Sequence, residues 1–273
     1  MAKPGDNFGD RMKGYEALET ERRFMPLLPV YARIDGRCFS SFTHGMRRPF
    51  DQAFSRAMVE TTKALVYATH ARIGYTQSDE ISLVWMQERS DSELFFDGKI
   101  QKMVSVLAGL ASATFCRICL DDEYLRGFAV KHAPHFDCRA FQLPNTGEAA
   151  NAFLWREQDA TKNAISMAAR SMYSHNELNG KSGAVMQEMI FQKGQNFNDY
   201  PNFFKRGTFV RRTYAERTMT ADELARIPEK HRPDPDAKHM RSEIVCPEMP
   251  PFSKVENRVA VIFDGADPVV GSA

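Results

Sequence analysis

The sequence lacks any run of apolar residues that approaches the ~20 needed to span a bilayer. Its N-terminus, residues 1–6, has no apolar core of the kind that a signal peptide carries. The five cysteines are an odd number without a secretory signal, which argues against a disulfide framework. We therefore expect a cytoplasmic protein that has no membrane partner.

The sequence also lacks an excess of either charge, since 36 Lys and Arg residues face 35 Asp and Glu residues. A protein without a global positive charge binds nucleic acid only through local basic patches. Three basic pairs are candidates for such patches, although short pairs of this kind are usually solvated surface: Arg47–Arg48, Lys205–Arg206 and Arg211–Arg212. There are no internal repeats and no low-complexity tract.

Two groups of cysteine and histidine have spacings that a metal site could use. Cys116 and Cys119 are spaced like half of a zinc site, but they lie within a helical pattern and no second pair follows. His132, His135 and Cys138 lie on an extended segment. We interpret both groups as structural.

Two short acidic motifs follow apolar, strand-like runs. Asp35 ends the first motif, after the apolar run at 27–32, and Asp79 and Glu80 separate the apolar runs at 73–76 and 81–85. Mg²⁺ is held by one or two carboxylates, waters and substrate phosphates, and two such ions can assist phosphoryl or nucleotidyl transfer. The alternative is that each motif is a solvated turn, because Asp-Gly and acidic hairpin tips are common turn sequences.

The hydrophobic pattern predicts an α+β fold with a ferredoxin-like βαββαβ core. Apolar periodicity indicates strands at 26–34, 73–77, 81–86 and 136–143, and helices at 50–72 and 99–120. In this topology the first and third strands are neighbours in an antiparallel sheet. Asp35 should therefore lie close to Asp79 and Glu80, which favours the metal site over two unrelated turns.

The remaining segments complete this prediction. Residues 11–22 form either part of an extended arm or a short helix, and helices follow at 145–173 and 182–192. Asn145 opens the first of these two helices with a sequence that resembles a capping box. Beyond Gly207 the chain is rich in proline and charge, and we expect loops with a last short strand near 259–263.

Several motifs, taken in order from residue 30 to residue 210, resemble the tRNA-His guanylyltransferase superfamily and most closely its bacterial guanylyltransferase-like branch. They are RIDGRCFSSF, RRPFD, GYTQSDEISLVW, HFDCRAFQLP, FLWREQDATKNAI, NGKSG, VMQEMIF and NFNDYPNFFKRG. The resemblance implies a polymerase-palm fold. It implies an N-terminal arm (1–25), a palm catalytic core (26–144), a helical region that completes the catalytic domain (145–210) and a loop-rich C-terminal extension (211–273).

The resemblance also implies roles for individual residues. Asp35 and Asp79 would ligate two or more Mg²⁺ ions with the Gly36 carbonyl, and Glu80 would be a further catalytic acid. The nucleoside triphosphate would be bound by the backbone from Gly36 to Ser40 and by side chains near it: Gly36, Arg37, Cys38, Phe39, Ser40, Arg48, Asp51 and Ser78. Arg48 would bind the triphosphate, and Asp51 would face the base. Ser78 also matches a position that meets the activated RNA end. The other candidates for binding RNA are Arg33, Lys102, Arg139, Asn163, Asn198, Lys205 and Arg206.

The resemblance implies an enzyme that adds nucleotides to the 5′ end of tRNA in the 3′-to-5′ direction, with ATP and GTP or another NTP as substrates, and it suggests a homo-tetramer. The chain departs from the guanylyltransferases proper at the 161–164 motif, at Cys38 and Ser40, and at Met186. These departures favour templated repair of 5′-truncated tRNA over untemplated guanine addition to tRNA-His. Two alternatives remain: a palm enzyme such as a nucleotide cyclase, and a non-catalytic RNA-binding protein.

Overall fold

The computed structural model describes residues 7–89, 92–234 and 236–271. Its centre is one antiparallel sheet with the strand order β4-β1-β3-β2-β5-β6. The strands are β1 (Val30–Gly36), β2 (Ile73–Gln77), β3 (Glu80–Trp85), β4 (Phe136–Gln142), β5 (Thr208–Thr218) and β6 (Lys238–Val245). The first four strands have the order expected of a ferredoxin-like core, and β1 lies between β3 and β4. The predicted α+β palm-like fold is confirmed.

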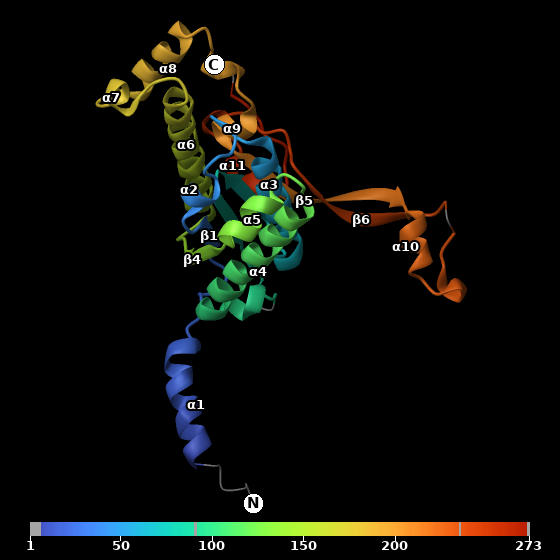
Figure 1. Cartoon of the computed structure of the whole chain (residues 1–273). Coiled ribbons are helices and arrows are strands. Elements are labelled where there is room, and N and C mark those ends of the chain that lie inside the picture. The colour runs from blue at the N-terminus through green and yellow to red at the C-terminus, as the bar shows by residue number, and fades with distance from the viewer. Residues whose placement is uncertain (1–6, 90–91, 235, 272–273) are drawn as a thin grey trace, which may run out of the picture.

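Helices cover both faces of the sheet (Figure 1). α3 (Gln52–Thr69) and α4 (Ile100–Asp121) pack on one face, and α6 (Thr146–Arg170) packs on the other. The remaining helices are shorter or peripheral: α1 (Asn7–Thr20), α2 (Phe39–Phe42), α5 (Arg126–His132), α7 (His175–Leu178), α8 (Gly183–Gln192), α9 (Asn202–Arg206), α10 (Ala221–Ala225) and α11 (Arg258–Phe263).

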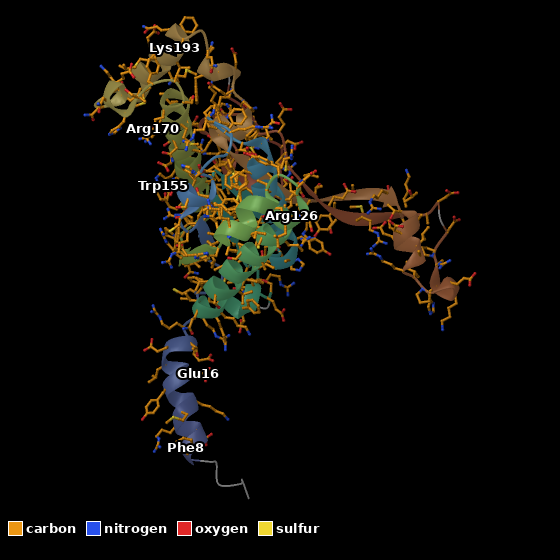
Figure 2. The ribbon with its side chains drawn as sticks, viewed as in Figure 1. Phe8, Glu16, Arg126, Trp155, Arg170 and Lys193 are labelled. Atoms are coloured by element: carbon orange, nitrogen blue, oxygen red, sulfur yellow. The ribbon has the colours of Figure 1, made fainter. Side chains whose placement is uncertain are left out.

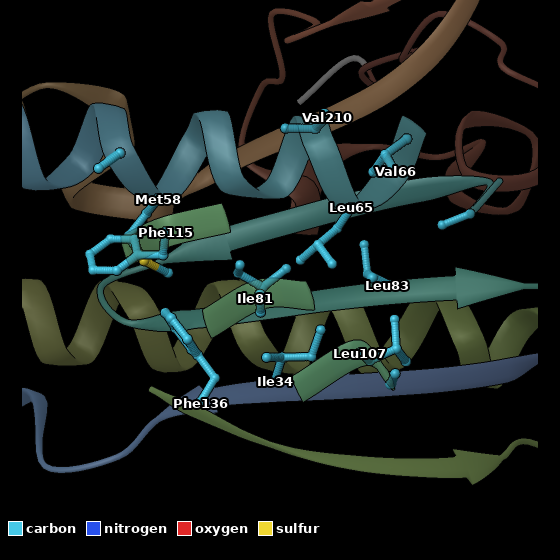
Figure 3. Packing of buried hydrophobic residues seen from close by; sticks show 14 of the residues in the cluster. Ile34, Met58, Leu65, Val66, Ile81, Leu83, Leu107, Phe115, Phe136 and Val210 are labelled. Atoms are coloured by element: carbon cyan, nitrogen blue, oxygen red, sulfur yellow. The ribbon is translucent and has the colours of Figure 1, made fainter. Parts of the chain in front are cut away.

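The main core lies between the sheet and the α3–α4 layer. Figure 3 shows Ile34, Ile81 and Leu83 pointing from β1 and β3 toward Met58 and Leu65 of α3, and all five side chains are buried. Successive side chains of a strand point to opposite faces. The neighbours of Ile34 in β1, Arg33 and Asp35, therefore lie on the α6 face of the sheet.

α4 bears on the expectation that no segment is apolar enough over about 20 residues to span a bilayer. Among the described residues it is the one helix long and apolar enough to cross a membrane by length and composition. In this fold its apolar stripe, which includes Met103, Leu107 and Phe115, is buried in the main core. The apolar residues of α4 therefore pack against α3 and against strands β1 and β4.

The C-terminal part differs from the expectation in two ways. The predicted strand at 259–263 is wrong, because this segment is α11, whose Val261 and Ile262 are buried in the cluster on the α6 side of the sheet. A short apolar run does not by itself distinguish a strand from a buried helix. The segment after Gly207 also contributes the two paired strands β5 and β6, of which β5 joins β2 in the central sheet. The domain boundaries after residues 25, 144 and 210 stay predictions.

The N-terminal segment takes the helical alternative, as α1, which extends away from the rest of the fold, as does the outer part of the β5–β6 hairpin (Figure 1). The other predicted helices are confirmed to within a few residues. Asp51 caps α3 by accepting from the N–H groups of Ala53 (2.9 Å) and Phe54 (3.1 Å). Asn145 caps α6 by accepting from the N–H of Glu148 (2.8 Å), which is one half of the predicted capping box.

Candidate active site

Asp35 lies near the end of β1, on the α6 face of the sheet. It is in register with Glu80 of β3 and with Asp137 of β4, so three carboxylates occupy one row across the sheet. The Asp35 side chain is 40% exposed, and Arg139 lies 3.9 Å from its Oδ2. The predicted meeting of the two acidic motifs is therefore present in the fold.

Asp79 lies in the tight turn between β2 and β3, where Ser78 has a positive φ of 49°. The Gly36 N–H donates to the Asp79 carbonyl (3.0 Å), which fastens this turn to the end of β1. Burial raises the pKa of the Asp79 carboxyl, and the nearby charge of Asp35 raises it further. Two carboxylates that repel each other in this way are suited to share cations.

The donor set fits Mg²⁺. Within residues 7–89, 92–234 and 236–271 no group of three or more His, Cys, Asp or Glu side chains is arranged to hold a metal. A pair of carboxylates beside a backbone carbonyl leaves the other positions to water and phosphate, as Mg²⁺ prefers. Cys119 is buried in the main core and Cys138 packs against it, as expected for structural cysteines.

Glu80 is held in a buried ion pair, whereas the sequence suggested a further catalytic acid. Its Oε1 accepts a hydrogen bond from Arg156 Nε (2.6 Å), and Arg33 Nε lies 3.7 Å from its Oε2. Both Glu80 and Arg156 are 6% exposed. Burial raises the pKa of Glu80, and the hydrogen bond and charge of Arg156 act in the opposite direction. Its partnership points to a role in positioning Arg156 and Arg33.

Sequence reasoning missed Arg156. The available signal was its spacing on α6, because Arg156 lies three residues after Phe153 and four before Ala160, both of which are buried. An arginine on the buried stripe of a helix requires a carboxylate partner. The sequence could not indicate which carboxylate that is.

A cavity of about 550 Å³ opens beside the carboxylates, between α6, α9, the loop at 43–51 and the turn at 77–80. Both Asp35 and Asp79 line it. Its basic lining residues are Arg33, Arg47, Arg48, Arg156 and Arg170. Arg170, near the C-terminal end of α6 (Figure 2), was not predicted from the sequence. A cavity of this size lined by both acidic and basic groups suits a nucleoside triphosphate with its cations.

The loop from Gly36 to Ser40 has fewer free N–H groups than predicted. The Gly36 N–H is bound to Asp79, and the Arg37 N–H donates to the His135 carbonyl (2.9 Å). The N–H groups of Cys38, Phe39 and Ser40 open helix α2 and have no partner in the described part of the chain. A Cβ atom on Gly36 would lie 2.5 Å from the Phe39 ring, so this close turn requires glycine.

The cavity also brings together several of the predicted nucleotide- and RNA-binding side chains. Ser78, Arg48, Asp51 and Asn163 line it beside the carboxylates. Asp51 accepts from its own helix and from the Tyr124 hydroxyl (2.8 Å), so its carboxylate also has a structural role. None of the predicted residues from Gly36 to Ser40, Arg37 included, is among the lining residues.

Other predicted RNA-binding residues lie outside the cavity. Lys102 is near the N-terminal end of α4, where its ammonium group lies 4.8 Å from the ring of Phe96. It is about 20 Å along the helix from Phe115, whose ring contacts Phe39 in the loop that follows Asp35. Lys205 donates to the Asn198 carbonyl, and Arg206 lies 4.0 Å from Glu157. These contacts support the α9 segment, and the geometry does not bring Lys102, Asn198, Lys205 or Arg206 to the carboxylates.

Glu157 gives the site region a pH-dependent stability. This residue of α6 is 4% exposed, accepts from the Phe252 N–H (2.8 Å), and has its pKa raised by burial from 4.5 to about 7. The folded state then holds a proton that the unfolded state releases, so stability falls as the pH rises from about 4.5 to about 7.

We expect Glu157→Gln to remove this dependence. The variant should gain stability over the wild type as the pH rises, by about 2–3 kcal/mol above pH 7, measured by urea unfolding at pH 5 and pH 8. The difference in unfolding free energy between the variant and the wild type reports the contribution of Glu157, because all other titrating groups are common to both proteins. Glu188→Gln on α8 is the control for loss of an exposed carboxylate. An equal pH slope for Glu157→Gln and the wild type would contradict this assignment.

A palm-like sheet that presents two carboxylates to an arginine-lined cavity is the arrangement of a palm-fold nucleotidyltransferase. The family model described as tRNAHis guanylyltransferase matches residues 9–144. A bacterial tRNA(His) guanylyltransferase (Thg1)-like protein solved in complex with ATP is 37% identical, with a TM-score of 0.70, over 75% of this chain and 88% of that chain. The chain belongs to the tRNA(His) guanylyltransferase family, whose members are nucleotidyltransferases.

Two further relatives extend the comparison. A bacterial protein of the same description, solved in complex with GTP, is 31% identical with a TM-score of 0.69, over 93% of this chain and 99% of that chain. An uncharacterized protein of Acanthamoeba polyphaga mimivirus is 30% identical over 60% of this chain. The match spans 63% of that viral protein's length.

Proposed function

We propose that this chain adds nucleotides to the 5′ end of tRNA in the 3′-to-5′ direction and repairs 5′-truncated tRNA by copying the facing strand. The observation that carries the proposal is the meeting of Asp35 and Asp79 beside an arginine-lined cavity of about 550 Å³. ATP and GTP are each bound in a related bacterial protein, which supports nucleoside triphosphates as substrates.

Two chemical steps are required. In activation, the 5′-monophosphate of the RNA attacks ATP, an adenylyl group is transferred and pyrophosphate departs. In the second step, nucleotide addition, the 3′-hydroxyl of the incoming nucleotide attacks the activated 5′ phosphate and AMP departs. Asp35, Asp79 and the Gly36 carbonyl would hold two or more Mg²⁺ ions, which when bound lower the pKa of the attacking hydroxyl and neutralise phosphate charge.

The chain's own basic groups support phosphate binding. Arg48 and Arg170 line the cavity from two different elements, the loop before α3 and the C-terminal end of α6. Arginine can hold phosphate oxygens through two parallel hydrogen bonds. The free N–H groups of Cys38, Phe39 and Ser40 add neutral donors at the end of β1. The Glu80–Arg156 pair orients Arg33 beside them.

The lining of the cavity favours templated repair over untemplated guanine addition. Ala164 is a lining residue and presents no polar group where the guanylyltransferases proper carry a polar motif. Thr161 is engaged elsewhere, because its hydroxyl contacts the carbonyls of Glu157 (3.1 Å) and Lys205 (3.0 Å). Because the chain lacks the polar motif of the guanylyltransferases proper at 161–164, we expect base pairing with the facing strand to select the nucleotide.

Two rival functions, a nucleotide cyclase and a non-catalytic RNA-binding protein, each leave one feature of the site without a use. A nucleotide cyclase has no evident use for the α9 segment that closes the cavity with Phe203 and Phe204. A non-catalytic RNA-binding protein would gain nothing from the carboxylates of Asp35 and Asp79, both of which are partly exposed, because both repel phosphates.

The decisive test is a 5′-extension assay on a tRNA that lacks its first nucleotide. We expect the nucleotide that pairs with the facing base to be added, and a change of the facing base to switch the nucleotide used. Each of the four template bases is combined with each NTP, and the Asp79→Asn variant is the inactive control. Efficient addition of guanine regardless of the facing base would overturn the repair proposal and restore tRNA-His maturation as the function.

We also propose a cytoplasmic homo-tetramer, as the family resemblance suggests. Light scattering in solution should give the mass of four chains of 31.0 kDa. A monomer mass at micromolar concentration would contradict this.

A further inference from the structure

β1 and the edge strand β4 present three matched rows of side chains on the α6 face. In register, they pair Asp35 with Asp137, Arg33 with Arg139, and Tyr31 with Phe141. Alternate residues share a face and rise about 6.6 Å per pair. The face therefore changes from acidic to basic to aromatic with increasing distance from the metal-binding carboxylates.

Trp155 of α6 lies beside the basic row. Its side chain is 51% exposed and lies on the surface of α6 (Figure 2). The guanidinium carbon of Arg33 lies 5.7 Å from its ring, and that of Arg156 lies 4.5 Å from it. The two guanidinium groups hold the Trp155 ring in place, and about half of the tryptophan surface remains exposed to solvent.

Phe141 continues the aromatic surface at the edge of the sheet. It is 38% exposed and packs against the buried Tyr31 ring (5.3 Å), which in turn contacts Phe153 of α6 (5.0 Å). The buried Tyr31 ring therefore holds the Phe141 ring in place. Single exposed apolar residues are ordinary, but Phe141 and Trp155 are each next to one member of the basic row, Arg139 and Arg33 respectively.

The charges on this surface identify its occupant. Arg139 is 55% exposed, and its contacts to Asp35 (3.9 Å) and Asp137 (3.7 Å) are long, so its donors remain available. Proteins bind single-stranded nucleic acid by pairing basic groups for the backbone with aromatic faces on which bases stack. Asp35, two residues along β1 from Arg33, is where the reacting 5′ phosphate would be held.

We propose that Trp155 is a stacking platform for the base of the 5′-terminal nucleotide of the RNA substrate, on the same side of the sheet as Arg139, which the family resemblance assigns to the RNA end. The proposal deepens the proposed function, because it assigns the second substrate to the β1–β4 face and leaves the cavity to the nucleoside triphosphate. Trp155 is a positioning and binding residue in this assignment.

The test measures RNA binding without NTP or Mg²⁺, so that it does not depend on catalysis. Two 5′-monophosphorylated RNA hairpins with a short single-stranded 5′ end are compared, one complete and one abasic at its first nucleotide. We expect Trp155→Ala to weaken binding of the complete RNA about tenfold and to leave binding of the abasic RNA nearly unchanged. Trp155→Phe, which keeps an aromatic face, should lose less.

Tyr67→Ala is the matched control variant. Tyr67 is 62% exposed and lies 5.3 Å from the guanidinium of Arg212, but it is near the C-terminal end of α3, which covers the opposite face of the sheet from α6. We expect it to bind both RNAs like the wild type. Stacking of a base should also quench the fluorescence of Trp155. The change in signal can be assigned to Trp155, because the other tryptophan, Trp85, is only 3% exposed.

Two outcomes overturn the platform. An equal loss for both RNAs would mean that Trp155 only packs against Arg33 and Arg156, and unchanged binding of the complete RNA would mean that the base lies elsewhere. Failure of the proposed function gives a different result: the wild type would then discriminate between the hairpins without adding any nucleotide to the truncated tRNA.

Discussion

Asp79→Asn is expected to lower the rate of nucleotide addition by about 10³-fold without lowering thermal stability. The carboxylate is partly buried and its pKa is raised by burial and by the charge of Asp35, so its negative charge does not stabilise the fold. The amide keeps the shape of the side chain but loses the charge that would hold cations. Incorporation of labelled nucleotide measures the first effect, and thermal unfolding measures the second.

Asp137→Asn is the matched control for this variant. Asp137 lies on the same face and in register with Asp35, but it does not line the cavity. We expect a change of less than tenfold in the rate. A similar loss for Asp79→Asn and Asp137→Asn would indicate a general effect of negative charge on this face, and near-normal turnover of folded Asp79→Asn would refute the assignment of the metal ligands.

The centre of the site could be predicted from the sequence because it depends on periodicity and topology. The alternation of apolar residues indicated the strands, and the βαββαβ order makes β1 and β3 neighbours whatever the details of packing. Asp35 and Asp79 meet for that reason. The start of α6 was also readable from the sequence, because Asn145 is a cap residue.

The remainder of the site depends on contacts between segments that the sequence does not relate. Arg156 is 76 residues from Glu80, and no local pattern pairs them. Lys102 was assigned by resemblance alone, and the length of α4 separates it from the carboxylates. The α11 segment was mistaken for a strand because its apolar run is too short to show a period.

The Glu80–Arg156 pair gives the largest expected effect on stability. Arg156→Met should cost about 3–5 kcal/mol, because it leaves the Glu80 carboxylate buried without its closest cation. Glu80→Gln should cost less, since the amide oxygen can still accept from Arg156, which also donates to Asp159 (3.0 Å). Urea unfolding of both variants at pH 8 measures this asymmetry.

The pH dependence of Arg156→Met distinguishes a charge effect from lost packing. Burial already raises the pKa of Glu80, and loss of Arg156 raises it further. An acid whose folded-state pKa is raised destabilises the fold above that pKa, and the penalty disappears as the pH falls below the unfolded-state value. The deficit of Arg156→Met should therefore shrink between pH 8 and pH 4.5. The double variant Glu80→Gln/Arg156→Met should recover part of the loss at pH 8. A deficit that is the same at both pH values and in the double variant would mean that Arg156 stabilises α6 by packing alone, and that Glu80 carries no charge at this position.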